Sequence, residues 1–246
     1  PVSDYARSRP PTKIGFRRGA SIDAESAIMA LVTKSANDVA AAIGEYLGGT
    51  EENFGVMMTA KARSLGMRST VFRNASGLPD PGQVTTARDM ALLGMALRKR
   101  FPQYYSYFSV AAVSFQNQTI RGHNALLKDV DGVDGIKTGY TRASGFNLVS
   151  SVHRDGKHVV AAVFGGDTAR ERNAKMQSLL TSALAKASRQ VTRKPALVAR
   201  APQPAVAKPP LRVAEAPNVA PPSPQVAAAP PSARERDAAI AVAKVR

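Results

Sequence analysis

Cysteine is absent from the 246 residues of this chain, and acidic residues are scarce beside basic ones. The absence of cysteine excludes disulfide frameworks, thiolate metal sites and cysteine nucleophiles. No apolar run approaches the ~20 residues that a membrane-spanning helix needs. No signal peptide is visible and the sequence opens at Pro1 without a methionine, so we expect an N-terminus that is processed or cut.

The formal charge is +16, from 34 Lys and Arg against 18 Asp and Glu. A basic surface favours anionic partners such as nucleic acid, anionic lipid or acidic cell-wall polymers, without choosing among them. A solvated basic face with no dedicated partner explains the charge equally well. Because no recognised nucleic-acid-binding motif accompanies the charge, we predict no nucleic-acid partner.

Composition divides the chain into two parts. Eleven of the 17 prolines lie between residues 195 and 231, among Ala, Val and Gln. Such a segment cannot bury a core, so we predict that residues 187–246 form a disordered, basic linker or tail. Residues 1–186 carry periodic apolar patterns and are long enough for one core, which predicts a single folded domain.

Helical periodicity dominates the first half of that domain, and strand-like patterns follow. Helices are expected over 23–47, 51–65, 86–100 and 168–186, strands over 109–115, 118–121, 146–152 and 158–164, and loops or turns over 1–20 and 73–85. The last two strands flank Arg154-Asp155-Gly156-Lys157, a hairpin signal that predicts antiparallel pairing. A helical block before an antiparallel sheet, with a C-terminal helix to cover it, indicates an α+β domain.

Two short motifs suggest chemistry. Lys137-Thr138-Gly139 lies in a strand-forming context, and such a triplet on a strand edge is one third of the active site of the penicillin-binding and β-lactamase group. Ser35-Ala36-Asn37, about a hundred residues earlier, matches a second motif of that group. Alone it means little, because serine is a common helix N-cap. The order and spacing of the two motifs give them weight.

With further strings in the same order, residues 1 to about 186 resemble the serine-type D-alanyl-D-alanine carboxypeptidases, the low-molecular-weight penicillin-binding proteins of peptidase family S11. The strings are Ser35-Ala36-Asn37-Asp38-Val39-Ala40, Gly77-Leu78-Pro79-Asp80, Thr86-Ala87-Arg88-Asp89-Met90, Asn124-Ala125-Leu126-Leu127, Gly132–Thr141, Ser144–Val149, and Gly165-Gly166 ahead of Arg172. One departure is Ser76, where many relatives carry histidine. The resemblance implies a β-lactamase/transpeptidase-like domain, an antiparallel sheet with a helical insertion, incomplete at the N-terminus.

The resemblance implies a hydrolase of peptidoglycan biosynthesis and cell shape. It would remove the terminal D-alanine from pentapeptide stems through a serine acyl-enzyme, without a cofactor or metal, and β-lactams would inhibit it. Its location would be periplasmic or otherwise extracytoplasmic. Some relatives carry a small β-domain and an amphipathic anchor where this chain has its Pro/Ala-rich tail, so the resemblance leaves membrane association open.

Acyl transfer needs a base, a proton route to the leaving amine, and positive potential for the oxyanion. The resemblance assigns these catalytic tasks to three residues. Ser35 would relay a proton toward the leaving nitrogen, Asn37 would hold the substrate amide, and Lys137 would place positive charge at the centre of the site.

The resemblance also supplies a substrate clamp. Thr138 and Gly139 would bind the substrate backbone as an added strand. Arg172 would recognise the terminal carboxylate, a task that suits a guanidinium fork. The alternative for Arg172 is an ordinary surface arginine on a helix, beside Arg170.

The nucleophile motif of the group, Ser-x-x-Lys, is missing: no serine of this sequence has lysine three residues later. Lys34 cannot replace that lysine for Ser35, because successive helix residues point in different directions. In the family the motif would lie about thirty residues ahead of Pro1. We therefore expect a fragment, and losing such a nucleophile costs on the order of 10⁶ in rate.

Two other functions stay open. A β-lactamase would use the same motifs, but no Glu-x-x-x-Asn deacylation loop follows Asn37, which argues against the class A type. A non-catalytic cell-wall-binding pseudo-enzyme would keep the clamp without the chemistry. His123, His153 and His158 have no partner at metal-ligand spacing, so we predict no metal site.

Overall fold

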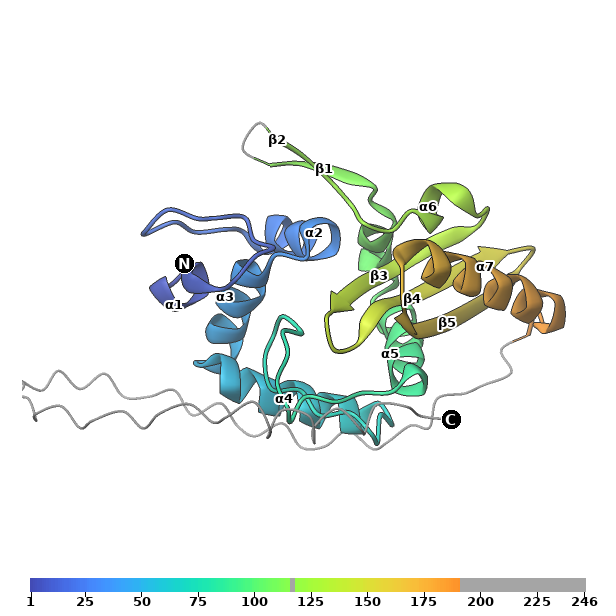
Figure 1. Ribbon diagram of the computed structural model, residues 1–246, viewed down its shortest axis with the longest axis horizontal. Coiled ribbons are helices and arrows are strands. Elements are labelled where there is room, and N and C mark those ends of the chain that lie inside the picture. The colour runs from blue at the N-terminus through green and yellow to red at the C-terminus, as the bar shows by residue number, and fades with distance from the viewer. Residues whose placement is uncertain (116–117, 191–246) are drawn as a thin grey trace, which may run out of the picture. The chain divides into compact units, whose positions relative to one another are not determined.

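The computed structural model describes residues 1–115 and 118–190, which belong to one compact unit, Pro1–Ala201 (Figure 1). The predicted tail therefore lies almost wholly outside the described residues. In chain order the elements are α1 (Asp4–Ser8), α2 (Ala24–Lys34), α3 (Asn37–Gly48), α4 (Glu51–Ser64), α5 (Ala87–Arg100), η1 (Pro102–Ser109), β1 (Ala112–Phe115), β2 (Gln118–Arg121), α6 (Leu126–Asp129), β3 (Val133–Thr141), β4 (Gly145–Arg154), β5 (Lys157–Gly166) and α7 (Ala169–Lys186). Across the part of the chain that the structure describes, no helix is both long and apolar enough to cross a membrane.

The segment predicted to be helical over 23–47 consists of two helices, α2 and α3. Ser35 separates them in the left-handed region, at φ 57°, and its backbone N–H closes α2 on the carbonyl of Ala30. The second helix, α3, begins at Asn37, inside the Ser35-Ala36-Asn37 motif. Periodicity alone missed the break because apolar residues continue on both sides of it.

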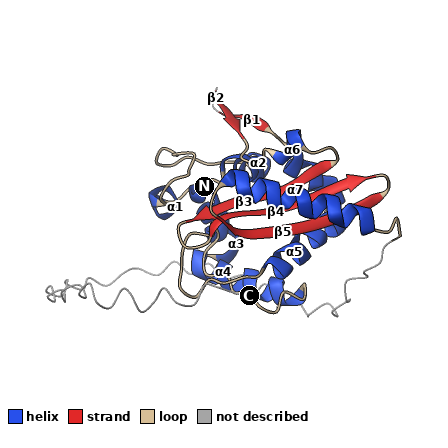
Figure 2. Cartoon of the chain, turned by 45° about the vertical axis from the view of Figure 1, so that its right-hand side comes forward, coloured by secondary structure: helices blue, strands red, loops and turns tan. Residues whose placement is uncertain are grey.

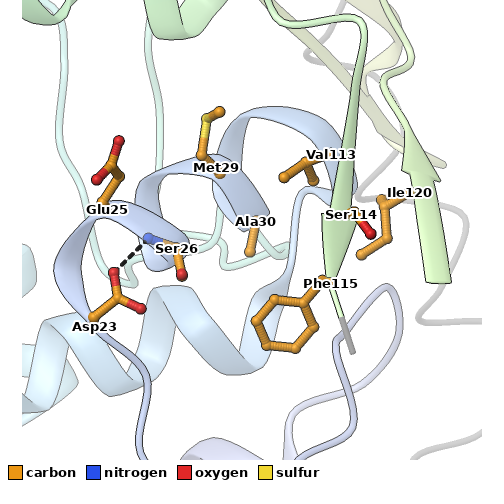
Figure 3. A pocket seen from close by; sticks show the side chains of 9 residues that line it. All are labelled: Asp23, Glu25, Ser26, Met29, Ala30, Val113, Ser114, Phe115 and Ile120. Carbon is orange, nitrogen blue, oxygen red and sulfur yellow. Dashed lines mark hydrogen bonds between the residues drawn. The ribbon is translucent and has the colours of Figure 1, made fainter. Parts of the chain in front are cut away.

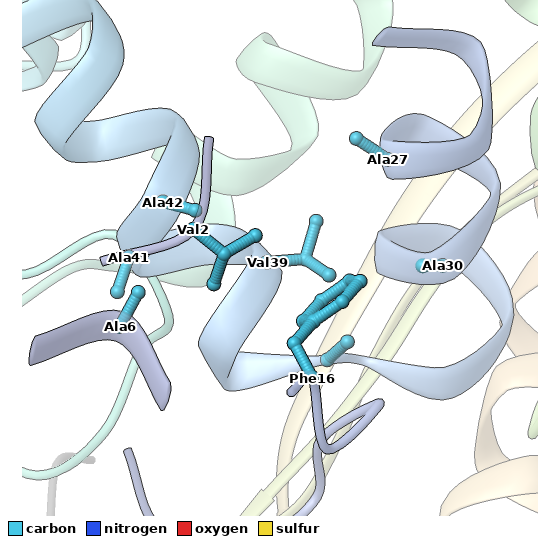
Figure 4. Packing of buried hydrophobic residues seen from close by; sticks show 9 residues of the cluster. Val2, Ala6, Phe16, Ala27, Ala30, Val39, Ala41 and Ala42 are labelled. Carbon is cyan, nitrogen blue, oxygen red and sulfur yellow. The ribbon is translucent and has the colours of Figure 1, made fainter. Parts of the chain in front are cut away.

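A small-residue core holds α1, α2 and α3 together (Figure 4). Phe16 and Val39 are its larger members, and buried alanines such as Ala6 and Ala41 let the backbones approach closely. The prediction that residues 1–20 form only loop is wrong for Asp4–Ser8. This helix is too short to show a period, and Ser3 caps it by accepting the N–H of Ala6 at 2.9 Å.

The three-stranded antiparallel sheet has the order β3-β4-β5 and lies between α7 and α5 (Figure 2). Successive residues of β4 point to opposite faces. Leu148 packs with Met176 and Leu180 of α7, whereas Val149 packs with Ile136 and residues of α5. The prediction that a C-terminal helix covers an antiparallel sheet is confirmed.

The predicted hairpin between β4 and β5 is also confirmed. Arg154 pairs with Lys157, and the two residues between them, Asp155 and Gly156, have φ of 55° and 71°. Two positive φ values are the requirement of the hairpin turn whose twist matches that of the flanking strands. A second hairpin joins β1 and β2, as the predicted strands required.

Candidate active site

Ser35 and Lys137 meet in space although 102 residues separate them in the chain. The Nζ of Lys137 donates a hydrogen bond to the Oγ of Ser35 at 2.5 Å and another to the carbonyl of Thr138 at 3.0 Å. The α2–α3 junction supplies Ser35 and strand β3 supplies Lys137. The structure thus brings the two predicted motifs together in one site.

Lys137 has a lowered pKa. Burial of the ammonium, and then the positive charge of Arg172, lower the pKa of Lys137 from 10.5 to about 8. A lysine that titrates this close to neutral pH can both hold and release a proton during a reaction. Because its hydrogen-bond partner is a hydroxyl, Lys137 and Ser35 form a route along which a proton can pass.

The segment before α2 holds Ser35 in its left-handed conformation. The Oγ1 of Thr12 donates to the carbonyls of Lys34 at 3.0 Å and Ser35 at 2.9 Å. The side chain of Asn37 donates through Nδ2 to the carbonyl of Pro10 at 3.0 Å, and its backbone N–H donates to the carbonyl of Thr12 at 2.8 Å. Since Nδ2 of Asn37 is engaged, Oδ1 is the atom with which this side chain could accept a substrate N–H.

Asp38, which the sequence analysis did not single out, fastens the same segment. Its carboxylate is fully buried and accepts the backbone N–H groups of Ile14 at 3.1 Å and Gly15 at 2.9 Å. A buried carboxylate is tolerated only when such donors replace water. The signal available in the sequence was an acidic residue directly after the Ser-x-Asn triplet, in the first turn of a helix.

Thr138 and Gly139 lie on the outer strand of the sheet. Thr138 pairs with Leu148 and Gly139 with Asn147, so one side of β3 is paired with β4 and the other forms the edge of this sheet. An edge strand presents N–H and C=O groups that an extended peptide can pair with. Both residues are partly or fully exposed, as such pairing requires.

Arg172 lies in the interior, which disagrees with the alternative of an ordinary surface arginine. The residue is only 4% exposed, near the start of α7. Its Nη1 donates to the carbonyl of Asn147 at 2.9 Å and its Nε to the Oδ1 of Asn173 at 3.0 Å. Its charge also depresses the pKa of Lys137, so the two cations act on the same region.

Two cavities adjoin α2. One, of about 10 Å³, is lined by Lys137 and Thr138 together with His123 and Asn124. Both polar atoms of the Asn124 side chain are buried and make no hydrogen bond within residues 1–115 and 118–190. The other, of about 200 Å³, lies between α2 and the β1–β2 hairpin and contains none of the predicted site residues (Figure 3). It is lined by Asp23, Glu25, Ser26, Met29, Ala30, Val113, Ser114, Phe115 and Ile120.

The family model for D-alanyl-D-alanine carboxypeptidase matches residues 2–168 of the chain. The chain belongs to this family. Among curated members, D-alanyl-D-alanine carboxypeptidase DacA of Escherichia coli K12 is 35% identical over 167 residues, which cover 68% of this chain and 41% of DacA. DacF of Bacillus subtilis 168 is 31% identical over 184 residues, covering 73% of this chain and 47% of DacF. The chain therefore spans less than half the length of these two members of the D-alanyl-D-alanine carboxypeptidase family.

Solved structures agree with the family and establish the fold. The D-alanyl-D-alanine carboxypeptidase DacD of Francisella tularensis superposes with a TM-score of 0.71 at 28% identity, covering 75% of this chain and 57% of that one. Penicillin-binding protein D2 of Listeria monocytogenes in its cefotaxime-bound form gives 0.63 at 30% identity, covering 74% and 71%. This member of the D-alanyl-D-alanine carboxypeptidase family thus has the predicted transpeptidase-like α+β fold.

Proposed function

We propose that this chain supplies two segments, Ser35–Asn37 and Lys137–Gly139, of the active site of a periplasmic or otherwise extracytoplasmic D-alanyl-D-alanine carboxypeptidase. This enzyme trims peptidoglycan pentapeptides. The observation that carries the proposal is the hydrogen bond between Lys137 and Ser35, which joins the two motif segments in one site. The family membership and the cefotaxime-bound structure of a relative support it. By the same reasoning the protein binds β-lactams and is inhibited by them.

Each side chain has a role that its surroundings support. Lys137, with its pKa near 8, exchanges a proton with Ser35, and Ser35 passes it to the leaving nitrogen of D-alanine. Asn37 accepts the N–H of the substrate amide through Oδ1. The free edge of β3 at Thr138 and Gly139 pairs with the substrate backbone.

Arg172 completes the clamp by attracting the terminal carboxylate. The guanidinium is fixed by hydrogen bonds to Asn147 and Asn173, so the carboxylate meets a donor that needs no rearrangement. The charges of Arg172 and Lys137 together favour an anionic substrate terminus and the developing oxyanion.

We propose further that these 246 residues do not complete the reaction alone. Acyl-enzyme formation requires the serine of a Ser-x-x-Lys motif, and the sequence contains no such pair. Removal of a serine nucleophile costs on the order of 10⁶ in rate. In this proposal Ser35 relays a proton with Lys137, and the nucleophile is a different serine.

The test is release of D-alanine from an acyl-D-alanyl-D-alanine peptide, measured with the complete gene product and with this polypeptide. The complete protein is expected to release D-alanine. Lys137→Ala is expected to lower kcat/KM at least a hundredfold, because Ser35 then has no lysine with which to exchange a proton. Lys175→Ala, on the exposed face of α7, is the matched control and should act like the wild type. No release by a complete protein that contains Ser-x-x-Lys would reject the proposal.

A further inference from the structure

Asn147 lies at an irregularity in the pairing of β4 with β5. Its neighbours Phe146 and Leu148 pair with Gly166 and Val163, so β5 contains one residue more than β4 across this interval. Such a bulge interrupts the regular ladder and is often placed beside a functional site. The backbone groups of the bulge need other partners, because regular pairing no longer satisfies them.

The side chain of Asn147 supplies one of those partners. Its Oδ1 accepts the N–H of Gly165 at 3.1 Å, and Gly165 has a φ of 79°, which favours glycine. Its Nδ2 donates to the Oγ of Ser144 at 2.7 Å, and Ser144 shares a further hydrogen bond of 2.7 Å with Thr141. One amide thus ties the bulge of β5 to the turn that ends β3.

The backbone of Asn147 links the two parts of the proposed substrate clamp. Its carbonyl accepts a hydrogen bond from Nη1 of Arg172, while its Cα is paired with Gly139 on the substrate-binding strand. The absence of a side chain at Gly166 allows α7 to start close to β5. A Cβ at Gly166 would lie 3.0 Å from the Cβ of Arg172, a contact tighter than ordinary packing allows.

We propose that Asn147 is a positioning residue that holds the guanidinium of Arg172 in a fixed relation to the edge of β3, and so sets the preference for substrates with a free terminal carboxylate. The proposal rests on the proposed function. Asn147 does not touch the substrate itself. Its side chain fixes the bulge, the bulge fixes the carbonyl, and the carbonyl orients Arg172.

The experiment compares two substrates of the complete gene product, an acyl-D-alanyl-D-alanine peptide with a free carboxylate and the same peptide with a terminal amide. In Asn147→Ala the ratio of the kcat/KM value for the free acid to that for the amide is expected to fall about tenfold. This is about the size of one charge-assisted hydrogen bond, here between Arg172 and the substrate carboxylate. The loss should lie in the KM of the free-acid substrate, with turnover of the amide unchanged. Asn53→Ala is the matched control, because it removes an asparagine side chain whose Nδ2 is also hydrogen-bonded, to the carbonyl of Gly48, but which lies exposed on α4.

Equal losses for both substrates in Asn147→Ala, or an unchanged ratio, would overturn the proposal. Ser144→Ala serves where Asn147→Ala does not melt cooperatively, since it removes the hydrogen bonds of the Ser144 hydroxyl, including those with Asn147 and Thr141, and keeps those of Asn147 with Gly165 and Arg172. Its ratio should fall about threefold, and an unchanged ratio overturns the proposal in that case. Absence of D-alanine release by the wild type would instead reject the proposed function, so the two failures are distinguishable.

Discussion

At the scale of single residues, the two sequence motifs predicted a shared site, and the structure places Lys137 beside Ser35. The residues that hold them in place were not predictable from the sequence. Thr12 acts through backbone carbonyls and Asp38 through backbone N–H groups. Any threonine or aspartate can make such contacts, so residue type carries no signal until the fold has brought the segments together.

Lys137 should titrate near pH 8, with Arg172 as part of the cause. Because the folded state releases this proton at lower pH than the unfolded state, the free energy of unfolding should rise as pH increases from about 8 to 10.5. Carbon-13 NMR of the Lys137 side chain measures the midpoint. Arg172→Gln should raise that midpoint, whereas Arg170→Gln, on the exposed side of α7, should leave it unchanged. A wild-type midpoint above pH 10 would contradict the account.

At the scale of elements, local signals predicted the longer helices and the β4–β5 hairpin well. Thr50 and Thr86 cap α4 and α5: each side chain accepts the backbone N–H of the residue three positions later. The helices α1, η1 and α6 were missed. Two of them are only four or five residues long, and η1 has threefold rather than 3.6-fold geometry, so none shows the period of a surface α-helix.

The contact of α5 with the sheet depends on a glycine. A Cβ at Gly94 would lie 2.7 Å from Cδ1 of Ile136 and 2.9 Å from Cγ1 of Val160. Gly94→Ala should therefore lower the free energy of unfolding by about 1–3 kcal/mol, as overpacking does, despite the better helix propensity of alanine. Urea denaturation measures the change.

The double variant Gly94→Ala, Val160→Ala supplies the control for that experiment. Val160→Ala removes one of the two crowded atoms, so the pair should cost less than the sum of the two single changes. Strict additivity, or a Gly94→Ala variant more stable than the wild type, would show that α5 does not lie as close to the sheet as the structure has it.

At the scale of the whole molecule, the site is assembled from segments that are distant in the chain. The α2–α3 junction contributes Ser35 and Asn37, β3 contributes Lys137, Thr138 and Gly139, and α7 contributes Arg172. The α+β class and the family could be predicted because several motifs occur in one order. The burial of Arg172 could not, because it depends on how α7 starts against the β5 bulge rather than on a pattern within α7.

In the proposed function, Ser35 and Lys137 belong to a site that is acylated at a serine of a Ser-x-x-Lys motif. The most direct test is intact-mass spectrometry of the complete gene product after incubation with benzylpenicillin, followed by peptide mapping. We expect one covalent adduct on that serine, formed at least a hundredfold more slowly in Lys137→Ala because the positive potential beside the oxyanion is lost. No adduct on a protein that carries the intact motif, or an adduct formed at an unchanged rate in Lys137→Ala, would contradict it.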